Sequence, residues 1–267
     1  MDRRQFTLAA AALGVAPALA RAVPANSLPP WVLKNPGRSP ENRARDPFRH
    51  PAESLQFWGL APGMTVVEIE PSGGYWTELL APFLNATHGR YVAAVSGDPT
   101  TFKARYAAMP TFGEIEVVPF SPQSGPLVPN GSADMVLTAR NFHNWMWQTG
   151  LVDKYLADFH AALAARAILA VEEHRADPRP MTSEASDGYV ATAYLVSAVE
   201  ARGFTLEAKS EINANPKDTK DYPFGVWTLP PTRRTHAKDQ PSPAGFDPAK
   251  YEAIGESDRM TLRFRKA

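Results

Sequence analysis

The stretch Val66–Trp76, "VVEIEPSGGYW", joins a β-branched run to the start of a helix through a turn that contains glycine. The run "MTVVEIE" (64–70) has the composition of a buried parallel strand. The next segment, "GGYWTELLAPFL" (73–84), predicts a helix. A strand that passes through a short turn into a helix is the repeating unit of parallel α/β sheets. The stretch therefore predicts a fold of that class.

The turn also indicates what kind of ligand this edge of the sheet would hold. In open α/β sheets the ligand lies beyond the carboxyl ends of the strands, close to the first strand-to-helix turn. Gly73 or Gly74 can adopt φ > 0, and the start of the following helix offers N–H donors. Glu68 and Glu70 share one face of the strand, and two carboxylates repel phosphate but attract a sulfonium or ammonium group. The turn argues against a dinucleotide.

The remainder of the chain alternates strands with helices. The predicted strands are 64–70, 90–96, 114–120, one within 132–145, 167–174, 204–211 and 260–266, and the predicted helices are 50–63, 73–84, 99–109, 151–165 and 192–204. Alternation of this kind predicts a three-layer α/β fold with a seven-stranded, mostly parallel sheet and helices on both faces. We expect the last strand to be antiparallel and the domain to span 48–267.

Three further regions are distinct from this alternation. Residues 1–22 have the charged start, apolar run and small residues of a secretory signal, and Arg3 and Arg4 resemble the twin-arginine export signal of bacteria. An ordinary signal or an uncleaved anchor is the alternative. Residues 23–47 are expected to form an extended N-terminal arm. Residues 212–258 contain seven prolines and are expected to form a surface excursion or a lid.

Composition limits the classes of partner and cofactor. The chain has 28 basic and 28 acidic side chains, so charge favours neither nucleic acid nor an anionic membrane. It has no cysteine, which excludes a disulfide framework, a thiolate nucleophile and a cysteine metal site. The signal predicts a periplasmic or otherwise exported bacterial protein with no membrane insertion after cleavage. We expect a small-molecule partner.

Four segments carry a resemblance to a known family: "PAESLQFWGLAPGMTVVEIEPSGGYWTELLAP" (51–82), "NFHNW" (141–145), "NPKDTKDYPFGVWTLPP" (215–231) and "DRMTLRFRK" (258–266). They resemble the class I S-adenosylmethionine-dependent methyltransferases, which have a Rossmann-like fold, and within them an exported bacterial subgroup. The resemblance covers most of the chain after the signal and implies S-adenosylmethionine as the cofactor.

The resemblance also implies which residues hold the cofactor. Glu68 takes the place of the family's acid, Glu70 and Ser72 take the first two glycine places, and Gly74 takes the last, with Gly73 beside it. The cofactor-binding residues implied in this way also include Asn141, after the fourth strand, and Asp98, near the end of the second. Asp98 either binds the ribose hydroxyls or caps the helix that follows it.

The end of the fourth strand carries candidates for chemistry. His143 and Asn144 would serve as a catalytic base and its hydrogen-bond partner, and Trp145 or Trp147 would stack on a flat substrate or on the sulfonium. The alternative is that His143 only caps or packs the strand end.

The fifth strand ends in Glu172-Glu173-His174, and its expected neighbour is the fourth strand, so His174 is a further catalytic candidate that would approach His143. With an acid the two histidines would suit a metal, but the spacing matches no zinc motif and we expect no metal site. A solvated strand end is the alternative for His174. The segment "DTKDYPFGVWTLPP" (218–231) either covers the pocket or anchors the excursion to the body of the domain.

Two functions from different classes are compatible with the sequence. The first is methyl transfer from S-adenosylmethionine to a small molecule. The second is non-catalytic binding of a small ligand by a degenerate methyltransferase fold, which export and the replaced glycines favour. Gly73, Gly74 and the cluster of histidine, asparagine and aromatic residues favour the enzyme.

Overall fold

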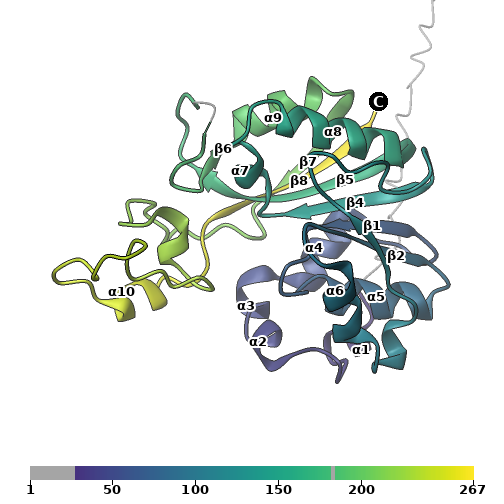
Figure 1. The fold of residues 1–267 in the computed structure, drawn as a ribbon, viewed down its shortest axis with the longest axis horizontal. Helices are drawn as coiled ribbons and strands as arrows, with labels where there is room; N and C mark the ends of the chain where they lie inside the picture. Colours follow the sequence, from purple (N-terminus) through teal and green to yellow (C-terminus); the bar gives the residue numbers. More distant parts are fainter. Residues whose placement is uncertain (1–27, 182–183) are drawn as a thin grey trace, which may run out of the picture.

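The sheet has the predicted α/β architecture. The computed structural model describes residues 28–181 and 184–267. Seven of its strands form one sheet in the order β3-β2-β1-β4-β5-β8-β7 (Figure 1). They are β1 (Thr65–Ile69), β2 (Arg90–Val95), β3 (Glu116–Pro119), β4 (Ala133–Ala139), β5 (Leu163–Ala176), β7 (Phe204–Ser210) and β8 (Arg259–Lys266). Only β8 runs against its neighbours, which confirms the expected antiparallel last strand.

One short strand was not expected. β6 (Val190–Ala191) pairs in parallel with the end of β5 and lies outside the main strand order. A two-residue strand has no periodicity to detect, so its existence depends on the long β5 extending past the other strands.

Helices cover both faces of the sheet, as predicted (Figure 1). One face carries α7 (Phe142–Trp145), α8 (Leu151–Ala162) and α9 (Thr192–Glu200), and the other carries α4 (Pro51–Trp58), α5 (Thr77–Ala86) and α6 (Pro99–Tyr106). Each layer buries its own hydrophobic cluster against the sheet. The three-layer arrangement follows from strands that are apolar on both faces.

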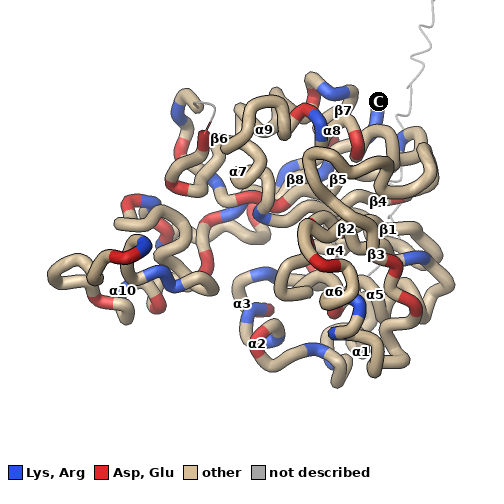
Figure 2. The backbone as a smooth tube through the Cα atoms, viewed as in Figure 1, with Lys and Arg blue, Asp and Glu red and all other residues tan. Residues whose placement is uncertain are grey.

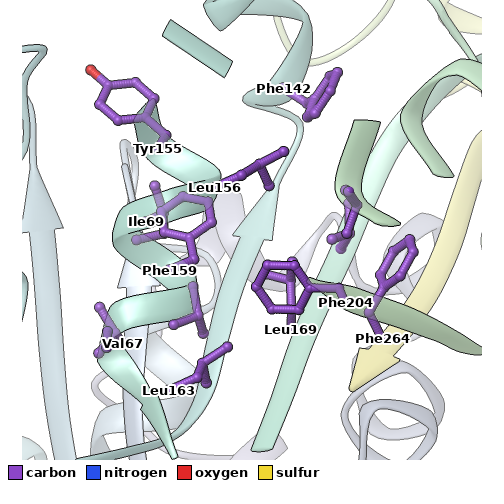
Figure 3. Packing of buried hydrophobic residues seen from close by; sticks show 14 of the residues in the cluster. Val67, Ile69, Phe142, Tyr155, Leu156, Phe159, Leu163, Leu169, Phe204 and Phe264 are labelled. Carbon is purple, nitrogen blue, oxygen red and sulfur yellow. The ribbon is translucent and has the colours of Figure 1, made fainter. Parts of the chain in front are cut away.

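The alternation of β1 shows how one strand serves both layers. Val67 and Ile69 belong to the cluster under α8, whereas Val66 belongs to the cluster on the opposite face. Figure 3 shows Val67 and Ile69 beside Leu156 and Phe159 of α8. Successive side chains of a strand point to opposite faces, so Glu68 faces the same layer as Val66.

The turn between β1 and α5 depends on one of its two glycines. Gly74 has φ 78°, and a Cβ there would lie 1.8 Å from the hydroxyl of buried Tyr106. The Tyr106 ring is itself packed against Phe102 and stacked on Phe112. Gly73 has no positive φ, and a Cβ there would meet nothing within 4 Å. Gly74 is therefore the glycine that the conformation requires.

The expected extended arm is wrong for the described residues 28–47. This region and the residues directly after it form three one-turn helices, α1 (Pro30–Leu33), α2 (Pro40–Arg43) and α3 (Asp46–Arg49). Each has a proline at its first or second position, where the missing N–H is not needed. Leu28 and Val32 are part of the core, so the packed body begins at least 20 residues earlier than predicted. The remainder of the predicted arm, 23–27, lies outside the described residues.

A buried ionic network fastens α3 to the end of the excursion. Glu256 accepts hydrogen bonds from Arg45, Arg49 and Arg259 at 2.7, 2.9 and 2.9 Å. Arg259 also bonds Glu172 of β5 at 2.7 Å. Figure 2 shows basic and acidic positions interspersed along α3 and along the segment that leads into β8. The network joins three parts of the chain that are far apart in sequence.

The Pro-rich segment 212–258 has little regular structure, as expected. It contains the short helices η2 (Gly225–Thr228) and α10 (Pro248–Glu252) and extends away from the sheet (Figure 1). Asp218 anchors it by accepting hydrogen bonds from the Tyr189 hydroxyl at 3.0 Å and from the Asp258 amide at 2.7 Å.

The predicted signal at 1–22 lies outside the described residues. Among the helices of 28–181 and 184–267, none is long and apolar enough to cross a membrane.

The two glycines of the turn give a matched pair of variants. We expect Gly74→Ala to lower the free energy of unfolding by about 2 kcal/mol or more, because it combines left-handed strain with a clash against Tyr106. Gly73→Ala should change it by no more than about 0.5 kcal/mol. Urea denaturation of both variants measures the difference, and equal values would contradict the assigned role of Gly74.

Candidate active site

A pocket opens to solvent beyond the carboxyl ends of β1, β4 and β5. Its volume is about 170 Å³, and it is lined by Arg49, residues 68–72, Tyr75, Trp76, residues 139–141, His143, Asn144, His174, residues 226–227 and residues 230–232. A second hollow, of about 300 Å³, shares residues 70–72 with the pocket and extends to Asp98 after β2. The turn after β1 therefore separates two adjoining cavities at the sheet edge where the sequence predicted a ligand.

Six of the nine predicted site residues line this pocket: Glu68, Glu70, Asn141, His143, Asn144 and His174. Asp98 lines the second hollow instead. Gly73 and Gly74 line neither cavity, although they belong to the turn that lies between the two.

The turn keeps a glycine-like backbone without glycine at two positions. Glu70 and Ser72 have φ 46° and 49°, in the left-handed region that glycine adopts most easily. Each costs about 1–2 kcal/mol relative to a right-handed conformation. Both side chains form hydrogen bonds. Trp145 Nε1 donates to Glu70 Oε2 at 2.8 Å, and Ser72 Oγ donates to the Glu70 carbonyl at 3.2 Å. The shape of the turn is retained, with a carboxylate and a hydroxyl added.

Glu68 lies beneath the turn and is almost fully buried. Its Oε2 accepts hydrogen bonds from Thr77 Oγ1 at 2.9 Å and from the Tyr91 hydroxyl at 2.6 Å. Burial raises the pKa of Glu68 to about 7, although the two hydrogen bonds act in the opposite direction. Glu68 is therefore less available than Glu70 to attract a cation.

Asp98 caps α6. Its Oδ1 accepts from the Thr100 amide at 2.9 Å, and its Oδ2 accepts from the Thr101 amide and hydroxyl at 3.2 and 2.7 Å. These hydrogen bonds, chiefly that of the Thr101 hydroxyl, lower the pKa of Asp98. The contacts of Asp98 are those of a helix cap, the second of its two predicted roles. Its carboxylate is exposed and also borders the second hollow.

Asn141 ties the ends of two strands together. Its Nδ2 donates to the Ile69 carbonyl at 2.9 Å, which links the second residue after β4 to the last residue of β1. The side chain is 7% exposed and borders the pocket. Asn141 therefore fixes the position of the loop that carries His143.

His143 is held by a buried carboxylate that sequence analysis had not assigned to it. Its Nδ1 lies 2.9 Å from Glu173 Oε1, and its amide donates to Glu173 Oε2 at 3.2 Å. The amide of His174 also donates to Glu173 Oε1, at 2.8 Å. A carboxylate surrounded by three N–H groups accepts from each of them, so the hydrogen of His143 is on Nδ1 and the lone pair is on Nε2. This is the arrangement of a positioned base.

His174 lies beside His143, with the ring centroids 5.2 Å apart. The alternative of a solvated strand end is wrong, because His174 is 8% exposed and its Nδ1 contacts Ser257 Oγ at 2.5 Å. Burial, with smaller contributions from His143, Arg140 and Arg259, holds the pKa of His174 well below its ordinary value. His174 is therefore neutral near pH 7.

The three side chains also meet the distance requirement for a metal. Ligand atoms of His143, Glu173 and His174 all lie within 4.8 Å of one another. Against this use, both carboxylate oxygens of Glu173 already accept hydrogen bonds, and His174 Nδ1 contacts Ser257. We interpret the cluster as a hydrogen-bonded base.

Asn144, Trp145 and Trp147 were predicted to assist His143 at the site. Asn144 is exposed at the pocket, and no hydrogen bond joins its side chain to His143 among the described residues; Glu173 is the partner instead. Trp145 is buried against α8, and Trp147 is 51% exposed and outside the lining.

The excursion adds one aromatic residue to the pocket, which Tyr75 and Trp76 also line. Trp227 lines the pocket with its ring centroid 5.9 Å from that of His143, and neighbouring Val226 packs into a small core cluster. The segment 218–231 therefore both covers the pocket and anchors the excursion.

Comparison with known proteins identifies the fold. The chain matches no protein-family model, and no curated protein has a significant sequence match to it. Solved structures do match. An S-adenosylmethionine-dependent methyltransferase from Aquifex aeolicus has a TM-score of 0.58 at 14% identity, over 85% of this chain and 95% of that chain. This chain has the fold of the class I S-adenosylmethionine-dependent methyltransferases.

Two more structures show the range of chemistry on this fold. The [4+2]-cyclase SpnF has a TM-score of 0.58 at 14% identity, over 87% of this chain and 85% of that chain. The 1,6-didemethyltoxoflavin-N1-methyltransferase of Burkholderia thailandensis, solved with 1,6-didemethyltoxoflavin and S-adenosylhomocysteine, has a TM-score of 0.50 at 13% identity, over 85% and 84% of the two chains. Because a cyclase shares the methyltransferase fold, the fold does not decide the reaction.

The buried Glu68 gives the stability of the protein a defined pH dependence. Its pKa is raised in the folded state, so its cost to stability is absent below its ordinary pKa of 4.5 and complete above about pH 7. We expect Glu68→Gln, which retains an acceptor oxygen for Thr77 and Tyr91, to remove a loss on the order of 2–3 kcal/mol between pH 5 and pH 8. Urea denaturation of both proteins at the two pH values measures this, and parallel pH profiles would contradict it.

Proposed function

We propose that this protein is an S-adenosylmethionine-dependent methyltransferase that acts on a small molecule, with His143 as the base. The observation that carries the proposal is the buried His143–Glu173 pair, which borders the pocket at the carboxyl edge of a methyltransferase-like sheet. A scaffold would have no need to fix the tautomer of a pocket histidine with a fully buried carboxylate.

The residues present fit the proposed cofactor. The left-handed conformations of Glu70 and Ser72 reproduce a glycine-rich turn, with one cavity on each side of it. Asp98 would bind ribose hydroxyls in the second hollow, and the Glu70 carboxylate would attract the positive charge of a sulfonium. When bound, S-adenosylmethionine supplies a methyl group activated by that sulfonium. The bound S-adenosylhomocysteine of the Burkholderia enzyme is in keeping with this assignment.

The chain's own residues would manage the acceptor and its proton. Glu173 holds the hydrogen of His143 on Nδ1, so Nε2 can take the proton that an acidic acceptor loses as its oxygen or nitrogen becomes methylated. Neutral His174 avoids a second positive charge next to His143 as that proton arrives. Trp227 and the prolines at 230 and 231 cover the pocket and restrict water.

The second candidate is a non-catalytic ligand-binding protein. The specific observation in its favour is that two glycine places of the turn carry Glu70 and Ser72. Their backbone conformation removes much of this argument, because the turn keeps its shape despite the side chains. The cyclase SpnF has the same fold, so the fold is also compatible with a reaction other than methyl transfer.

We further propose that residues 1–22 direct export by the twin-arginine route, on the basis of Arg3, Arg4 and the apolar run that follows. Replacing both arginines with lysine should leave the protein in the cytoplasm of a bacterial host, because that route requires the arginine pair. Cell fractionation with immunodetection measures the distribution. Unchanged export of the double variant would contradict the twin-arginine assignment.

The proposed function is tested by calorimetric binding of S-adenosylhomocysteine and by transfer of a labelled methyl group to a metabolite pool. We expect His143→Gln and Glu173→Gln to lower the transfer rate by roughly 10²–10⁴-fold, while the dissociation constant for S-adenosylhomocysteine changes little. His88→Gln, which alters an exposed histidine outside the pocket, is the matched control. Absence of binding would overturn the methyltransferase assignment, and full transfer by His143→Gln would overturn the role of the base.

A further inference from the structure

Two arginines of the pocket have unused hydrogen-bond donors. Arg49 is 0% exposed, and only its Nε is bonded, to Glu256, so Nη1 and Nη2 have no partner. Arg140 is half-buried, its Nε has no partner, and no hydrogen bond or ion pair joins its side chain to any described residue. Both residues line the pocket. Buried guanidinium nitrogens without partners are costly, so they call for a ligand.

Charged groups of both signs surround the two arginines. Four guanidinium groups, those of Arg45, Arg49, Arg140 and Arg259, gather around the carboxylates of Glu172 and Glu256. Glu172 Oε2 also lacks a hydrogen-bond partner. Burial is the main cause that lowers the pKa of Arg140, whereas the carboxylates of Glu256 and Glu172 act in the opposite direction.

The backbone at Arg140 adds a second cost. Arg140 has φ 62°, a left-handed conformation that a long side chain rarely adopts. Its amide donates to the Glu172 carbonyl at 2.7 Å, so the conformation is held by the sheet edge. Strain and unpaired charge at one residue of a pocket favour a functional role over a structural one.

We propose that Arg49 and Arg140 form an anion subsite that binds a carboxylate or phosphate group of the methyl acceptor. The assignment of the anion to a methyl acceptor rests on the proposed function, whereas anion binding by the two arginines does not. A planar guanidinium donates two parallel hydrogen bonds to such a group. The acceptor is therefore an anionic small molecule.

The position of Arg140 assigns the anion to the acceptor. Arg140 is close enough to His174 to contribute to lowering its pKa, and His174 is next to His143. Asp98, which is proposed to face the cofactor, borders the second hollow, which neither arginine lines, whereas Glu70 borders both cavities. The other source of a carboxylate is the amino-acid end of S-adenosylmethionine, and the experiment distinguishes the two.

The first arm uses inorganic phosphate and sulfate with Arg140→Met. We expect the wild-type protein to bind these anions and the variant to bind them at least about ten-fold more weakly. We also expect the variant without anion to melt about 2–4 °C higher, because a half-buried charge without a hydrogen-bonded partner has been removed. Arg202→Gln, which alters an exposed arginine paired with Asp153, is the control and should leave anion affinity unchanged.

Thermal unfolding and calorimetric titration at constant ionic strength measure both effects. Equal anion affinity in wild type and Arg140→Met would overturn the subsite. A variant that melts lower than wild type would also overturn it, because Arg140 would then be a structural residue with partners.

The second arm compares S-adenosylhomocysteine with 5′-methylthioadenosine, which lacks the amino acid. If Arg140→Met weakens only S-adenosylhomocysteine, the anion belongs to the cofactor and the assignment to the acceptor is overturned. Unchanged affinity for both compounds, with anion binding lost, supports the acceptor. If wild type binds neither compound but binds phosphate through Arg140, the methyltransferase proposal fails while the anion subsite stands.

Discussion

The carboxylate of Glu256 is the contact on which the shape of the pocket depends. It is 3% exposed and accepts hydrogen bonds from arginines of α3 and β8. A buried carboxylate is stable only while its partners stay in place. The N-terminal helices, the end of the excursion and β8 must therefore pack together, and this packing brings Arg49 to the pocket that Trp227 also lines.

Three of the nine described non-glycine residues with positive φ line this pocket. Glu70, Ser72 and Arg140 all line it and all have left-handed backbones, at about 1–2 kcal/mol each. Glycine would relieve that cost but would remove a carboxylate, a hydroxyl and a guanidinium. Retaining these side chains at the expense of stability is typical of residues that bind or react, and it agrees with an enzyme more closely than with an inert scaffold.

The fold was largely accessible from local patterns. The β1–turn–α5 unit, the adjacency of β4 and β5 and the antiparallel β8 all agree with prediction. The N-terminal segment was mispredicted because helices of one turn have no periodicity, and its prolines suit an extended chain as well as a helix start. Packing of Leu28 and Val32 into the core decides between these, and that contact is not visible in the segment itself.

The sequence by itself determined the order of strands and helices and the edge at which their polar ends gather, because periodicity and chain connectivity are local properties. Only the tertiary structure decided which acid serves His143. Glu172 and Glu173 are adjacent in sequence and point to opposite faces, so Glu173 meets His143 while Glu172 meets Arg259. Strand parity separates the two acids, but the register and the packed neighbours assign each to its partner. For the same reason, the unpaired state of Arg140 emerges only when every surrounding side chain is in place.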